Sequence, residues 1–170
     1  MDTIYEAYAL KYAERGAKRP ENFMGGDPHD APMPMDYYVW LLRSPQHTFV
    51  IDTGFSREMA GKRKRTYLRT PAEALSLMGV DANAVGEVIL THLHYDHAGT
   101  FQDFPNAKFH LQDDEMNYAT GRYMRFGRFA HGYEVEDVVG VVRLVYRNRV
   151  DFHRGVAQLA VVTPAPTAVV

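Results

Sequence analysis

The sequence contains no cysteine among its 170 residues. This absence excludes disulfide bridges, thiolate metal sites and cysteine nucleophiles, and it leaves histidine and the carboxylates as the metal-binding side chains. The chain also lacks any apolar run of membrane-spanning length, and its N-terminus has no basic segment followed by a long apolar one. We therefore expect no signal peptide, no membrane partner and a cytoplasmic location.

Neither sign of charge dominates the sequence, since 19 Lys and Arg face 21 Asp and Glu and the net charge is -2 at pH 7. A balance this close to neutral gives no reason to expect nucleic acid as a partner. The composition, with 46% hydrophobic and 24% charged residues, is that of an ordinary globular protein. We expect one domain, because 170 residues are enough for one buried core.

One short segment concentrates metal-binding side chains. His92, His94, Asp96 and His97, which we call the histidine loop, follow an apolar run directly. Imidazole and carboxylate are the ligands that borderline divalent ions prefer. His92 and His94 would project to the same side of an extended backbone and reach one ion, while Asp96 and His97 lie beyond the turn and could reach a second. The loop therefore predicts a metal site, and a polar surface loop is the alternative.

The pattern His-x-His-x-Asp-His, followed by Ala-Gly, resembles the signature loop of the metallo-β-lactamase superfamily of hydrolases. Residues 48–54 resemble the strand and Asp-Thr-Gly turn that precede this loop in the superfamily. Within the superfamily, the N-acyl homoserine lactonase-like branch is the most similar. The similarity lies in residues 33–40, in residues 52–55 and in the sequence of the histidine loop. The resemblance spans about residues 4–155.

This resemblance implies an α/β fold, the layered αββα sandwich, with two divalent metal ions, zinc first and iron, manganese or cobalt as alternatives. His92 and His94 would bind one ion, and Asp96 and His97 the other. A metal-bound hydroxide would open a lactone or ester in a small-molecule substrate such as an acyl homoserine lactone, which is a quorum-quenching reaction. Asp96 would also accept the proton of the attacking water. A glyoxalase-type thioesterase of the same superfamily is the alternative.

The role of several further residues can be interpreted in two ways. Asp52 either supports the histidine loop through hydrogen bonds or is an ordinary turn aspartate. Residues 33–35 and Tyr37 either border an acyl-chain pocket or pack in the core. The aromatic connector at residues 122–131 is open to the same two interpretations. Three further histidines that could be considered as additional ligands are expected to be surface or hydrogen-bonded residues; they are His110, His131 and His153.

The rest of the pattern predicts one sheet-and-helix unit, half of the αββα sandwich. Strands are expected at residues 4–12, 37–43, 48–52, 87–91 and 107–111. Helices are expected after the Thr70 cap, at residues 112–119 and at residues 135–146. Residues 16–35 read as an irregular loop. The basic segment at residues 57–69 is expected to be a solvated face, with phosphate or nucleic-acid binding as the alternative.

The sequence departs from the family pattern near its end. After Arg154 there is no charged residue and no histidine, whereas complete family members carry a Gly-His ligand, a bridging aspartate and a last histidine downstream. We therefore expect residues 1–155 to be the N-terminal half of the domain and residues 156–170 an uncharged tail outside the family pattern. An inactive fragment that binds metal weakly is an alternative to the enzyme. A half-sandwich would also expose apolar sheet surface and self-associate.

Overall fold

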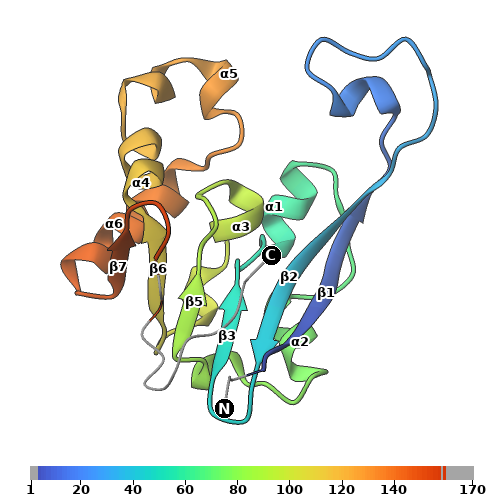
Figure 1. The fold of residues 1–170 in the computed structure, drawn as a ribbon. Helices are drawn as coiled ribbons and strands as arrows, with labels where there is room; N and C mark the ends of the chain where they lie inside the picture. Colours follow the sequence, from blue (N-terminus) through green and yellow to red (C-terminus); the bar gives the residue numbers. More distant parts are fainter. Residues whose placement is uncertain (1–3, 158, 160–170) are drawn as a thin grey trace.

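The computed structural model describes residues 4–157 and 159. Its centre is a seven-stranded sheet in the order β4-β1-β2-β3-β5-β6-β7 (Figure 1). The strands are β1 (Glu6–Arg15), β2 (Met35–Arg43), β3 (Thr48–Ile51), β4 (Thr66–Tyr67), β5 (Glu87–Ile89), β6 (Lys108–Gln112) and β7 (Val150–His153). Strands β4, β1, β2 and β3 pair in antiparallel fashion, and β3, β5, β6 and β7 run parallel.

Short helices connect the strands. They are α1 (Arg57–Lys62), α2 (Pro71–Ser76), α3 (Tyr95–Ala98), α4 (Asp113–Ala119), α5 (Gly127–Ala130) and α6 (Val135–Tyr146). Single 3-10 turns lie at Arg19–Asn22, Ala82–Ala84, Phe101–Asp103 and Arg122–Arg125. Among the described residues, no helix has the length and apolar character needed to cross a bilayer.

All five predicted strands and all three predicted helices are present, and two strands were not predicted. Strand β4 is only two residues long and lies inside the basic segment, while β7 follows α6 at the edge of the sheet. The predicted cap of α2 is confirmed, since the Thr70 hydroxyl accepts the Glu73 amide at 3.0 Å and the Glu73 carboxylate accepts the Thr70 amide at 2.6 Å. Most of the predicted tail at 156–170 lies outside the described residues.

The two faces of the sheet differ in what covers them. Along β2, Tyr37, Val39 and Leu41 are buried, whereas Tyr38 and Trp40 between them are 39% and 44% exposed. The buried set faces the core, which also receives side chains from α2, α4 and α6. Tyr37 packs edge-on against Phe55 at 5.1 Å, so core packing is its role here. The alternation follows from the two-residue period of a strand with one covered face.

The exposed aromatic side chains of β2 predict self-association of the 170-residue chain. Trp40→Lys should lower the association constant for dimerisation several-fold, because it places a charge in an apolar patch that a second copy of the chain would bury. Leu77→Lys is the matched control, since Leu77 is also exposed but lies at the end of α2. Sedimentation velocity over a concentration series measures the effect. A wild-type chain that stays monomeric throughout contradicts the prediction.

Candidate metal centre

The histidine loop lies where two parallel strands end. Ile51 at the end of β3 pairs with Ile89 at the end of β5, and the Asp52 amide donates to the Ile89 carbonyl at 2.8 Å. The carboxyl ends of parallel strands meet at one edge of a sheet, so the residues after β3 and after β5 become neighbours. In Figure 1, α3 sits directly above these two strand ends.

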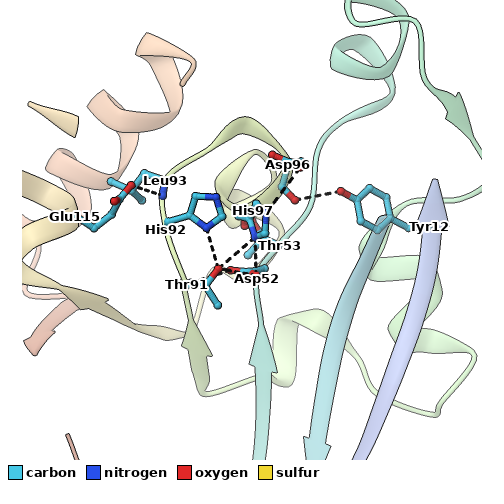
Figure 2. A network of polar contacts seen from close by, with 9 residues as sticks. All are labelled: Tyr12, Asp52, Thr53, Thr91, His92, Leu93, Asp96, His97 and Glu115. Carbon is cyan, nitrogen blue, oxygen red and sulfur yellow. Dashed lines mark hydrogen bonds and ion pairs between the residues drawn. The ribbon is translucent and has the colours of Figure 1, made fainter. Parts of the chain in front are cut away.

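Asp52 ties the loop to β3. Its carboxylate accepts the Thr91 amide at 2.8 Å and the Thr91 hydroxyl at 2.9 Å, and its Oδ2 lies 2.7 Å from His97 Nδ1 (Figure 2). Asp52 is 5% exposed and adopts a positive φ of 61°. This backbone conformation costs a non-glycine residue about 1–2 kcal/mol, which the hydrogen bonds of the carboxylate help to offset.

His97 is oriented by that carboxylate. Burial lowers the pKa of His97, but the hydrogen bond and the charge of Asp52 outweigh it and hold the pKa above its ordinary value. Because Nδ1 faces Asp52, Nε2 is the nitrogen turned away from it, and it lies 3.7 Å from the carboxylate of Asp96. A carboxylate on one imidazole nitrogen is the arrangement that orients metal-binding histidines.

His92 and His94 complete the group. The His92 ring lies 4.4 Å from the His94 ring and 3.8 Å from the His97 ring, measured between centroids. Burial lowers the pKa of both His92 and His94, and the neighbouring imidazoles lower that of His92 further. Neutral imidazole is the form that binds a metal ion. The fold thus brings together all four residues of the histidine loop.

The chemical types of the donors fit a divalent transition metal, since three imidazoles and a carboxylate lie at one edge of the sheet. Within residues 4–157 and 159, however, no group of three or more His, Asp or Glu side chains already has the arrangement needed to hold an ion. His92 Nδ1, for example, lies 3.1 Å from the Thr91 hydroxyl. The loop therefore offers donors without a preformed coordination shell.

Two residues that the sequence reasoning missed hold the loop from the opposite side. Glu115 of α4 accepts the Leu93 amide at 2.8 Å and the Tyr133 hydroxyl at 2.9 Å on the same oxygen (Figure 2 shows the first of these). The Tyr133 ring in turn packs edge-on against His94, with 4.6 Å between centroids. In the sequence Glu115 looks like another acidic residue at a helix start, after Asp113 and Asp114, so no local signal identifies it.

Gly132 also contacts the loop. Its carbonyl accepts the Tyr95 amide at 2.8 Å, and a Cβ atom on Gly132 would lie 2.6 Å from His94 Nε2. Only glycine allows the backbone to approach the imidazole this closely. Gly132 and Tyr133 thus form one wall of the loop, which we call the 132–133 wall.

The three further histidines, His110, His131 and His153, make contacts outside the histidine loop. In β6, His110 Nδ1 lies 2.9 Å from His153 Nε2 of β7, and His110 Nε2 lies 2.6 Å from the carboxylate of Glu87 in β5. These contacts link three parallel strands across one sheet face. The expectation that His110 and His153 are hydrogen-bonded residues is confirmed. His131 contributes its carbonyl oxygen, which accepts the Arg63 guanidinium at 2.9 Å.

Several known proteins are similar to this chain in sequence or in fold. N-acyl homoserine lactonase AiiB of Agrobacterium fabrum is 29% identical over 113 residues, which cover 59% of this chain and 41% of that protein. The solved structure of an N-acyl homoserine lactone hydrolase with N-hexanoyl-L-homoserine at its catalytic metal centre has a TM-score of 0.67 at 16% identity. It matches 94% of this chain and 63% of its own.

A second solved structure, the dizinc quorum-quenching lactonase AidC, gives a TM-score of 0.66 at 17% identity, over 94% of this chain and 61% of its own. At these identities the structural matches establish the fold, a metallo-β-lactamase fold of which this chain spans about three fifths. The chain spans less than half the length of the curated relative. The family model described as the metallo-beta-lactamase superfamily matches residues 33–170. The chain belongs to the metallo-beta-lactamase superfamily.

Proposed function

We propose that this chain is the metal-loop half of a metal-dependent hydrolase that opens a lactone or ester bond, with an acyl homoserine lactone as the substrate type. The observation that carries the proposal is the gathering of His92, His94, Asp96 and His97 at one strand edge, with Asp52 behind them. The lactonase names of the relatives support the choice of bond. Residues 1–155 would form the half-domain.

In this proposal, His92 and His94 hold one divalent ion and Asp96 and His97 hold a second, zinc foremost. Bound metal would supply Lewis-acid activation of water and carbonyl at this edge. The protein's own groups would orient the ligands and accept the proton. Asp52 orients His97, the Asp96 carboxylate accepts the proton of the attacking water, and the Tyr12 hydroxyl holds the Asp96 carbonyl at 3.1 Å.

Exposed aromatic side chains support an apolar acyl group as part of the substrate. Tyr123, Phe126 and Phe129 are all 47–50% exposed, and Phe129 contacts both other rings at 6.0 and 6.3 Å. Tyr123 belongs to the 3-10 turn, Phe129 to α5 and Phe126 to the junction between them, shortly before the 132–133 wall in sequence. Exposure at this level disfavours a purely core role for the connector. A contiguous apolar surface beside a polar site is typical of a binding site.

A second candidate is a non-catalytic fragment that binds metal weakly. It is favoured by the absence of a preformed ligand group among the described residues. The two candidates differ in metal content and turnover, so one set of measurements separates them.

Elemental analysis and hydrolysis assays test the proposal directly. We expect about two zinc ions per chain, with fewer in His92→Ala and the full content kept in His47→Ala, whose imidazole lies in the turn before β3. With zinc present, N-hexanoyl homoserine lactone should be opened, and Asp96→Asn should slow this by at least about 100-fold. Preference for a thioester would indicate the glyoxalase type. No metal and no turnover would favour the second candidate.

The Asp52–His97 contact predicts a pH effect. Asp52→Asn should lower the pKa of His97, because it removes the charge that raises it. The raised folded pKa means that the ion pair stabilises the fold fully below the unfolded value of about 6.5, and that this contribution is lost as pH rises through the folded value. NMR titration of the metal-free chain measures the pKa. Asp81→Asn, at the start of the 3-10 turn Ala82–Ala84, is the control and should leave it unchanged.

The 132–133 wall predicts a glycine requirement at one position. Gly132→Ala should weaken zinc binding by about tenfold, the usual scale for residues that support metal ligands, because its new methyl group displaces the His94 ring. Gly127→Ala is the matched control, since a Cβ there meets no atom within 4 Å. Competition against a chromophoric chelator measures the affinity. Equal affinities of the two variants would refute a role for the close approach.

A further inference from the structure

A groove of about 550 Å³ opens beside the histidine loop. Its side chains come from the basic segment and from the residues before α6, and they include Lys62, Arg63, Arg65, His131, Tyr133 and Glu134. The groove shares the 132–133 wall with the loop, because the Tyr133 ring that lines it also packs against His94 at 4.6 Å. A molecule bound at the loop could therefore extend into the groove.

Two of the three cations in the groove are already engaged. The Glu134 carboxylate, whose side chain is 17% exposed, accepts Lys62 at 2.6 Å and Arg63 at 2.7 Å. Burial raises the pKa of Glu134, but these two hydrogen bonds outweigh it and hold the pKa below its usual range. Arg63 is further fixed by its position 3.9 Å from the centre of the Tyr95 ring. The expectation of a purely solvated basic face is thus wrong for Arg63, which is 13% exposed.

Arg65 is placed differently. Its Nε donates to the Tyr95 hydroxyl at 3.4 Å, and its guanidinium carbon lies 5.9 Å from the centre of the Tyr37 ring. Among the described residues, no carboxylate forms an ion pair with Arg65 and no acceptor bonds its two terminal nitrogens. Three cations and one carboxylate leave the groove with an excess of positive charge, in a chain whose net charge is -2. The attraction for anions is therefore local.

We propose that this groove is a subsite for a carboxylate group of the substrate, with Arg65 as the residue that binds it. The inference rests on the proposed hydrolysis of a lactone or ester bond, and it goes beyond acyl homoserine lactones, which carry no carboxylate, to esters or lactones that carry one away from the scissile bond. A guanidinium held at Nε presents its terminal nitrogens as a planar fork that matches a carboxylate. Glu134 shows that the neighbouring cations already accommodate a carboxylate at this place. Tyr95, between His94 and Asp96 in sequence, links Arg65 to the loop.

Succinate binding to the full chain tests the assignment. In metal-free buffer, isothermal titration calorimetry and amide chemical shifts should show succinate bound in the groove, and dimethyl succinate, which is neutral, should bind at least about tenfold more weakly. Arg65→Gln should weaken succinate binding by about tenfold. Arg65→Lys, which keeps the charge but loses the fork, should give an intermediate loss.

Lys64→Gln is the matched control. It removes the same charge from the neighbouring position, and the Lys64 side chain does not line the groove. It should change succinate affinity less than about twofold. Equal losses in Arg65→Gln and Lys64→Gln would overturn the proposal, as would equal binding of succinate and its dimethyl ester. Melting by circular dichroism checks that each variant folds. Because the readout needs neither zinc nor turnover, absence of lactone opening would leave this result intact, and absence of succinate binding would leave the hydrolase proposal intact.

Discussion

The contacts of the Asp52 carboxylate are the interaction on which the site depends. One buried side chain joins the end of β3 to Thr91, two residues after β5, and it also sets the orientation of His97. Without it, the two strand ends would still pair and the Thr53 hydroxyl would still donate to the His97 carbonyl at 3.0 Å, but Thr91 and the His97 ring would lose the carboxylate that orients them. The positive φ of Asp52 fits this role, since strained backbone persists where the surrounding structure over-determines it.

The loop is held between two supports that come from distant parts of the chain. Asp52 and Tyr12 lie on one side, and Glu115 with the 132–133 wall lies on the other. Because each support bonds a different loop residue, the imidazoles are confined even though they do not yet converge on a common point. Ligand positions that are restricted before metal arrives reduce the entropy lost on binding.

The sequence predicted the elements whose signals are local. The capping box at Thr70 and the apolar period of α6 each lie within one short window, and each matches the structure. The spacing in the histidine loop is equally local, and the structure brings its residues together without a coordination shell. Glu115, Tyr133 and Arg65 could not be found in this way, because their roles depend on partners far away in sequence. Glu115, for instance, bonds Leu93 across 22 positions. Strand β7 is only four residues long, and its pairing with β6 defines it.

The shared wall has a consequence for how substrate recognition and metal binding are coupled. Tyr133 contacts His94 with its ring and Glu115 with its hydroxyl, and it also lines the basic groove. The next residue, Glu134, forms ion pairs with Lys62 and Arg63. An anion that drew either cation away from Glu134 would therefore pull on the segment that buttresses His94. In this geometry, groove and loop are joined by two consecutive residues, so we expect a ligand in one to alter the restraint on the other.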